Sequence, residues 1–230
     1  RTRMWGDLDG AMSKAYQIVE GSYNAGPQFH REAAGITVKS WFEEGSLLVI
    51  ETPSQWIHHV ADQVHRATGH PRRRIDVRGI GHGAFRDQLL LFPAQAAVHV
   101  ALIALRSRRP VVAHYPPEEL IAVLPARPPI RVVHSSGLDE SGNLSAVESE
   151  VTVDLGAYPF FSEEICDRLL AGALGTYRSK HGRILVRAIR SNAAPMHGYE
   201  GFGSSQGYFA LESHINRTTE IAQSEPIGWR

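Results

Sequence analysis

The chain has 230 residues, 43% hydrophobic and 21% charged, which suits one soluble globular domain or two small ones. Its 24 basic and 24 acidic residues cancel, so the charge balance indicates neither a nucleic-acid partner nor a membrane surface. The single cysteine, Cys166, excludes an internal disulfide framework and a cysteine-ligated metal cluster within this chain. We therefore expect a reducing, cytoplasmic environment. Arg1 rather than methionine opens the chain, which is typical of a processed chain or a piece of a longer polypeptide.

Periodicity and turn residues predict helices and strands along the whole chain. In the first half they are a helix over 7–17, a strand over 18–23, a hairpin over 36–42 and 47–51, a helix from Thr52 to Gly69, a strand over 75–77, a helix over 88–105, a strand over 111–114 and a short helix from Pro116. In the second half they are a hairpin over 130–136 and 144–154, a Ser162-capped helix to Ala173, a strand over 184–189 and a last helix after residue 203. Hairpins mixed with helices predict an α+β fold, with mixed β-sheets and helices packed on one face in a two-layer sandwich.

A glycine loop before the last helix is the most informative stretch. Gly198, Gly201 and Gly203 run directly into a helical pattern. Glycine permits positive φ and close approach of the backbone to a ligand, and a helix N-terminus presents free N–H groups. We expect an anion site there, most often for phosphate, with Ser204 or Ser205 as the helix cap.

Two earlier helix starts repeat this chemistry, at the Ser54-Gln55 turn and at the Gly79–Phe85 loop. If the fold brings all three together, they would hold a large polyanionic ligand through backbone N–H groups, with Gln55 and Gln206 as side-chain donors. The glycine spacing does not match a dinucleotide fingerprint, and no Walker loop is present.

A helical cluster of His58, Asp62 and His65 offers a second kind of site. Their spacing places His58 on one face with each of the other two, as a metal site requires. There is no HExxH motif and no convincing third ligand, so a polar helix face is the favoured interpretation.

Several segments, in a consistent order, resemble one known family. Residues 201–207 and then 209–212 are similar to the molybdopterin-contacting segment of xanthine dehydrogenases and aldehyde oxidases. Residues 52–60 resemble the family's glutamine-bearing turn, and residues 81–85 its phenylalanine-bearing loop. The remaining matching segments are 19–23, 28–32, 109–111 and 154–158. Together the matches extend over about 200 residues.

The resemblance implies that residues 1–230 form the first of two molybdopterin-binding domains of a large subunit, as a fragment of a longer protein. Such enzymes hydroxylate an aldehyde or N-heterocycle with oxygen from water. The implied cofactor is molybdopterin, or its cytosine dinucleotide form, whose metal has no side-chain ligand. The implied partners are the remaining molybdopterin-binding domain and iron–sulfur and FAD subunits or domains. The family's catalytic glutamate lies in the second domain, so we expect no catalytic residue here and no activity from this chain alone.

The resemblance also implies which residues contact the cofactor. They are Gln55, Gly83, Ala84, Phe85, Arg86, Glu200, Gly201, Phe202, Gly203 and Gln206. Gln55 is expected beside the molybdenum oxo group. Arg127 is the candidate substrate contact, against the alternative of a solvated loop arginine.

Two of these residues depart from the family pattern. Arg86 stands where the family continues with glycines and a lysine, and Glu200 stands where an arginine is common. A carboxylate beside an anionic cofactor in a partly buried site costs about 1 kcal/mol or more. We hypothesise that Arg86 and Glu200 pair with each other. The alternative function is a cofactor-free, degenerate domain that serves as an assembly or interaction module.

Overall fold

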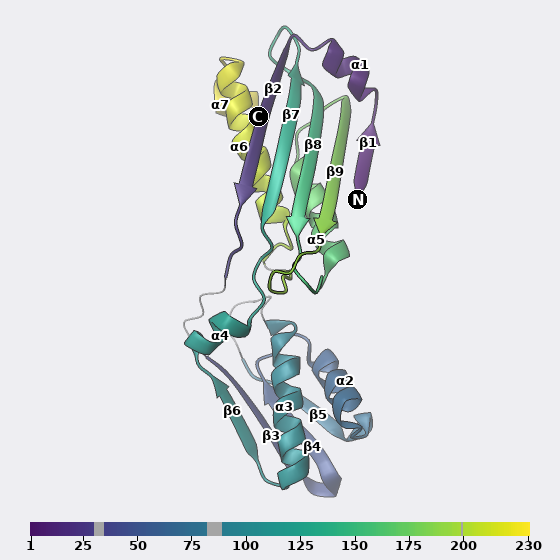
Figure 1. The fold of residues 1–230 in the computed structure, drawn as a ribbon, viewed down its shortest axis with the longest axis vertical. Helices are drawn as coiled ribbons and strands as arrows, with labels where there is room; N and C mark the ends of the chain where they lie inside the picture. Colours follow the sequence, from purple (N-terminus) through teal and green to yellow (C-terminus); the bar gives the residue numbers. More distant parts are fainter. Residues whose placement is uncertain (30–34, 82–88, 199) are drawn as a thin grey trace. The chain divides into compact units, whose positions relative to one another are not determined.

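In a computed structural model of the protein, the structure describes residues 1–29, 35–81, 89–198 and 200–230 (Figure 1). The chain divides into two compact units. Unit 1 comprises residues 1–28 and 125–230, and unit 2 comprises residues 29–124. Each unit is a mixed sheet with its main helices on one face, which confirms the predicted α+β class.

Unit 1 is built on a five-stranded sheet with the order β1-β9-β8-β7-β2. Its strands are β1 (Thr2–Trp5), β2 (Gln17–Ala25), β7 (Ile130–Leu138), β8 (Leu144–Asp154) and β9 (His181–Ile189). Only β8 and β9 pair in parallel, because the helix between them carries the chain back across the sheet. The helices are α1 (Leu8–Ser13), α5 (Ser162–Leu174), α6 (Ser204–Ile221) and α7 (Pro226–Trp229).

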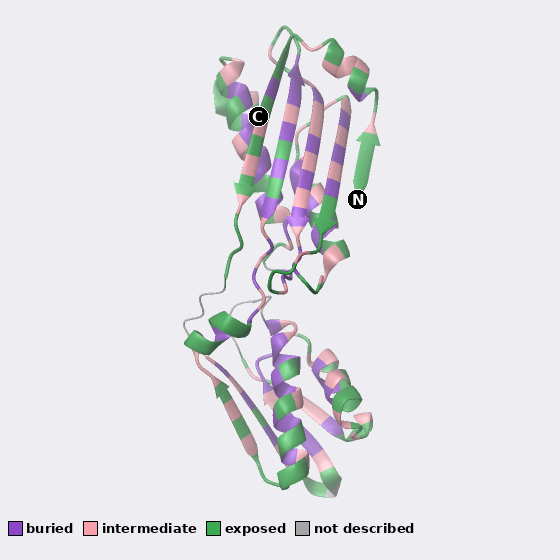
Figure 2. Ribbon diagram, viewed as in Figure 1, coloured by how far each residue is buried: buried purple, intermediate pink, exposed green. Residues whose placement is uncertain are grey.

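The helices α5 and α6 cover one face of this sheet (Figure 1). Alternate residues of the long strands are buried beneath them (Figure 2), among them Val132 and Val151. Gly172 on α5 and Gly207 on α6 bring the two helix backbones into contact, since a Cβ at Gly172 would lie 2.7 Å from the carbonyl oxygen of Ser204. Small residues at this crossing thus fix where α6 begins.

Unit 2 is built on a four-stranded sheet with the order β5-β4-β3-β6. Its strands are β3 (Ile36–Glu43), β4 (Leu47–Thr52), β5 (Ile75–Gly79) and β6 (Val111–Tyr115). Its helices are α2 (Ile57–Thr68), α3 (Phe92–Ser107) and α4 (Pro117–Val123), with short 3₁₀ turns over Glu44–Ser46 and Arg72–Arg74. The α2 helix crosses over between the parallel strands β4 and β5.

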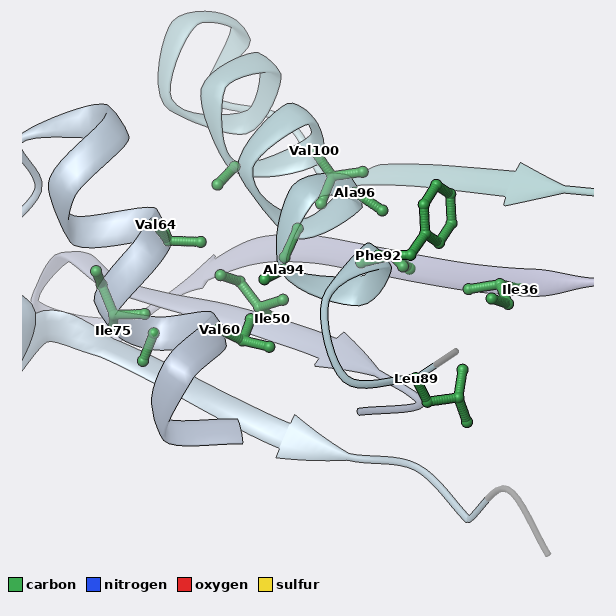
Figure 3. Packing of buried hydrophobic residues seen from close by; sticks show 14 of the residues in the cluster. Ile36, Ile50, Val60, Val64, Ile75, Leu89, Phe92, Ala94, Ala96 and Val100 are labelled. Carbon is green, nitrogen blue, oxygen red and sulfur yellow. The ribbon is translucent and has the colours of Figure 1, made fainter. Parts of the chain in front are cut away.

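The core of unit 2 is a layer of aliphatic side chains between its sheet and the helices α2 and α3 (Figure 3). Ile50 of β4 and Val60 of α2 are fully buried there, and Val100 of α3 is nearly so. The α2 helix ends at Gly69 in the left-handed conformation, with φ 71°, as the sequence predicts.

The predicted elements agree with the structure except at a few termini. The sequence missed β1 and α7, and the predicted helix over 7–17 ends at Ser13 because Gln17 already pairs with Leu138 in the sheet. The predicted cap at Ser162 is wrong, since Phe161 occupies the N-cap position of α5 and makes no side-chain cap bond. Among the described residues, no helix has the length and apolar character to cross a bilayer.

Candidate functional site

The glycine loop of unit 1 adopts a left-handed conformation at three successive residues. The φ angles of Gly201, Phe202 and Gly203 are 86°, 48° and 98°. A positive φ is uncommon for a residue other than glycine. Gly203 is the N-cap of α6 and supplies no side-chain cap bond. The predicted special backbone at the start of this helix is confirmed.

Neighbouring side chains hold Phe202 in this unusual conformation. Its ring meets the ring of Phe161 edge to face, with centroids 5.4 Å apart. The ring also lies against the backbone of Gly198, where a Cβ would overlap it. Left-handed non-glycine residues persist only where their surroundings over-determine them. Phe202 therefore has a packing role in the loop, and its contact with a cofactor stays a prediction.

The two serines after the loop do not cap the helix, so that prediction is wrong. The Ser204 hydroxyl donates to the carbonyl oxygen of Gly201 at 2.7 Å, and the Ser205 hydroxyl donates to that of Glu200 at 3.1 Å. Both hydroxyls thus stabilise the loop carbonyls. They leave the N-terminal amide groups of α6 without a serine acceptor.

Three successive residues of the 126–128 segment support the loop from below. The amide of His197 donates to the carbonyl oxygen of Ala126 at 3.1 Å. The Nη2 of Arg127 donates to the carbonyl oxygen of Glu200 at 3.1 Å. The Nε2 of Gln206 donates to the carbonyl oxygen of Pro128 at 2.9 Å. This segment therefore fixes the loop before, within and after its left-handed run.

Two buried acceptor atoms at the loop lack a partner among the residues that the structure describes. They are Oε1 of Gln206 and Nε2 of His197, whose residues are 3% and 1% exposed. Burial lowers the pKa of His197, which favours the neutral ring. Its Nδ1 then donates to the carbonyl of Gly198 and leaves Nε2 as an acceptor. Because buried polar atoms are normally satisfied, these acceptors fit a ligand that brings N–H or O–H donors.

The Gln55 turn belongs to unit 2, where β4 ends and α2 begins. The amide of Gln55 donates to the carbonyl oxygen of Leu89 at 3.4 Å, and the amide of Ile80 donates to that of Thr52 at 3.1 Å. The turn thus joins the end of β5 and the residues that lead into α3. Two of the three predicted helix starts are therefore neighbours. The third lies in unit 1, so the meeting of all three stays a prediction.

Four predicted cofactor contacts, Gly83, Ala84, Phe85 and Arg86, lie outside the described residues, and so does one partner of the hypothesised Arg86–Glu200 pair. Glu200 is exposed, and the structure places its backbone carbonyl, rather than its carboxylate, against Arg127. A substrate contact of Arg127 stays a prediction.

The histidine cluster on α2 does not form a metal site. Asp62 pairs with Arg72 at 2.6 Å, and Nδ1 of His65 is hydrogen-bonded to the carbonyl oxygen of His70 at 2.8 Å. Within the described part of the chain, no three metal-binding side chains converge. The favoured interpretation, a polar helix face, agrees with these contacts.

Sequence reasoning missed His197 and the supporting role of residues 126–128. No pattern marks His197, since histidines are scattered through the chain. The segment Ala126-Arg127-Pro128-Pro129 carries a visible signal, because two prolines after an arginine favour an extended, rigid backbone.

Comparison with known proteins identifies the class that this fold and loop define. The family model described as molybdopterin cofactor-binding domain matches residues 1–230. The chain therefore belongs to the molybdopterin cofactor-binding domains of the xanthine dehydrogenase and aldehyde oxidase family, as the sequence predicts.

Among characterised relatives, the chain is similar to a probable xanthine dehydrogenase subunit of Bacillus subtilis, with 31% identity over 63% of this chain and 19% of that protein. It is also similar to the nicotinate dehydrogenase large molybdopterin subunit of Eubacterium barkeri, with 23% identity over 98% of this chain and 53% of that protein. The chain thus spans about half or less of the length of these relatives.

Solved structures share the fold. Quinoline 2-oxidoreductase from Pseudomonas putida 86 superposes with a TM-score of 0.87 at 21% identity, over 100% of this chain and 30% of that one. The aldehyde oxidoreductase from Desulfovibrio gigas superposes with a TM-score of 0.84 at 22% identity, over 99% and 25%.

Proposed function

We propose that this chain supplies part of the molybdopterin cradle of an oxidoreductase that hydroxylates an aldehyde or an N-heterocycle with oxygen from water. The match of the family model to residues 1–230 supports the cofactor class. The observation that carries the proposal in this chain is the pair of unpartnered buried acceptors on Gln206 and His197. A pterin ring system carries N–H donors that suit such acceptors.

The residues of this chain bind and orient in this scheme. Gln206 and His197 accept hydrogen bonds from the cofactor, and the start of α6 favours its anionic groups. Gln55 and the 201–203 backbone complete the contacts that we assign to described residues. When bound, the cofactor supplies two-electron redox chemistry at molybdenum. The proton-abstracting base would come from the second molybdopterin-binding domain.

The finer assignments belong to the same proposal. The cofactor is molybdopterin or its cytosine dinucleotide form. The partners are the remaining molybdopterin-binding domain and iron–sulfur and FAD subunits or domains, and the complex is cytoplasmic. Two relatives bear the names of subunits, one of a probable xanthine dehydrogenase and one of a nicotinate dehydrogenase, which supports an assembly of this kind.

Elemental analysis of the full-length native protein tests the proposal. After expression in a host that makes the cofactor, we expect stoichiometric molybdenum in the wild type and a marked loss in Gln206→Leu and His197→Leu. Gln17→Leu, on the exposed start of β2, is the matched control and should retain the metal. A wild-type protein without molybdenum, from a host that loads another molybdenum enzyme, would favour the cofactor-free assembly module instead.

A further inference from the structure

Arg127 connects two parts of unit 1 that are far apart in the sequence. Its Nη1 donates to Oε1 of Gln28 at 2.6 Å, and its Nη2 donates to the carbonyl oxygen of Glu200 at 3.1 Å. The backbones of Gln28 and Arg127 also pair in both directions, at 2.9 Å and 3.3 Å. One guanidinium thus ties the end of the first segment of unit 1 to the glycine loop.

We propose that Arg127 is a positioning residue that holds the glycine loop in its left-handed conformation. The functional consequence, a loop ready to receive the cofactor, rests on the proposed function. The peptide unit between Glu200 and Gly201 carries the argument. In a trans peptide the C=O and N–H groups point in opposite directions. Arg127 and the Ser205 hydroxyl both donate to the Glu200 carbonyl oxygen, so they direct the Gly201 N–H to the other side.

The strained backbone that follows makes this orientation matter. Phe202 has a φ of 48° between two left-handed glycines, a conformation that relaxes when its supports are removed. Phe161 and Gly198 fix the ring of Phe202, whereas Arg127 fixes the peptide that precedes the run. A hydrogen bond from a charged donor is stronger than one from a neutral hydroxyl, so Arg127 is the principal support and Ser205 the secondary one.

A positioning role differs from the substrate contact expected from the sequence. A residue that only binds substrate would leave the backbone of the loop unchanged when replaced. A positioning residue changes the loop before any substrate is present. The planar guanidinium is also needed, because it reaches Gln28 and Glu200 with separate nitrogens.

Hydrogen exchange of the full-length protein, followed by mass spectrometry, tests the role directly. In Arg127→Met we expect the amides of residues 200–206 to exchange about tenfold faster or more, the factor for loss of one hydrogen bond to a charged group. The rest of α6 and the thermal midpoint should change little. Arg127→Lys, which can reach one acceptor at a time, should recover part of the protection. Arg131→Met, an exposed arginine of β7, is the matched control and should match wild type.

Unchanged exchange in the loop of Arg127→Met would overturn the proposal, and a rise in KM with unchanged exchange would assign Arg127 to substrate binding instead. If Arg127→Met does not fold, Gln28→Met removes the anchor of the guanidinium from an exposed position and should loosen the same peptide by a smaller factor; unchanged exchange there also counts against the role. Molybdenum content separates the two proposals. Faster loop exchange in a protein whose wild type carries no molybdenum supports the positioning role and contradicts the proposed function.

Discussion

The two units share one construction, a mixed sheet with helices on one face, but they bury different chemistry. In the described part of unit 2, the buried polar residues are small ones at the sheet and its margin, Ser40, Thr52 and Ser54. Unit 1 buries larger polar side chains, and they are His134, Ser136, Ser149, His197, Gln206, His214, Thr218 and Thr219. The stability of unit 2 therefore follows its apolar volume, whereas that of unit 1 also depends on hydrogen bonds and protonation.

A histidine layer under α6 shows the difference most clearly. His214 is hydrogen-bonded through Nδ1 to the hydroxyl of Tyr23 at 3.1 Å and through Nε2 to that of Ser136 at 2.9 Å. His134 stacks on it, with ring centroids 5.1 Å apart. Burial lowers the pKa of His134 to about 3 and that of His214 to about 4. Both rings are therefore neutral at physiological pH.

The largest expected effect lies at the helix crossing of unit 1. Gly172→Leu forces a side chain into the space where α5 meets the backbone of Ser204 and Gly207. Overpacking against backbone leaves little room to relax, so we expect a loss of about 4 kcal/mol in the free energy of unfolding. Urea unfolding of the protein measures it. Ala171→Leu, one residue away on the exposed side of α5, should cost little. Equal effects of the two substitutions would show that the crossing is not tightly packed.

The second prediction concerns the histidine layer and acid. The pKa of His134 is about 3 in the folded chain and about 6.5 without burial, so the unfolded chain takes up protons first as the pH falls. Stability is thus full above about pH 6.5 and falls toward the folded pKa values. His134→Leu removes one titrating group and also Nε2, which has no partner in the described chain. The loss of unfolding free energy between pH 7 and about pH 4.5 should shrink by about 2 kcal/mol.

Its control must keep a titrating histidine out of the interior. His58→Leu on the exposed face of α2 should leave the pH dependence unchanged. The groups that face the layer are Tyr23 on β2 and, through its charge, Arg217 on α6, and neither changes protonation in this range. An identical acid response in His134→Leu and wild type would contradict the assignment of acid sensitivity to this layer.

The smallest expected effect lies on the open face of the unit 2 sheet. Lys39 and Glu51 pair across β3 and β4 at 2.6 Å, with side chains 46% and 26% exposed. Exposed pairs of this kind contribute little, so Lys39→Met should cost about 0.5 kcal/mol and less at high salt. Urea unfolding at low and high salt measures both. A loss several times larger would mean that charge matters as much in unit 2 as in unit 1.

Much of the fold was predictable because its signals are local. Gly69 ends α2, Asp7 caps α1 through the amide of Gly10, and turn residues separate β7 from β8. The family membership was equally readable, since the glycine loop keeps its pattern. The division into two units was not, because no composition shift marks Gln28 or Pro125.

The failures in the site have a physical reason. A serine before a helix is an acceptor for its amides in most proteins, but Ser204 and Ser205 donate to loop carbonyls whose positions depend on Arg127 and on the left-handed run. Arg127 itself was expected at a substrate, because its bonds to Gln28 and Glu200 span 99 and 73 residues. Contacts of such separation leave no local trace in a sequence.

The Gln28–Arg127 bridge also has a topological consequence. The chain leaves unit 1 at Gln28 and re-enters it at Pro125, and the two strand-like residues beside these points pair as antiparallel neighbours, the arrangement found at the base of a hairpin. Unit 2 is thus a module inserted at a single point of unit 1. A short turn in place of residues 29–124 would restore a continuous hairpin and keep every hydrogen bond of the glycine loop described above.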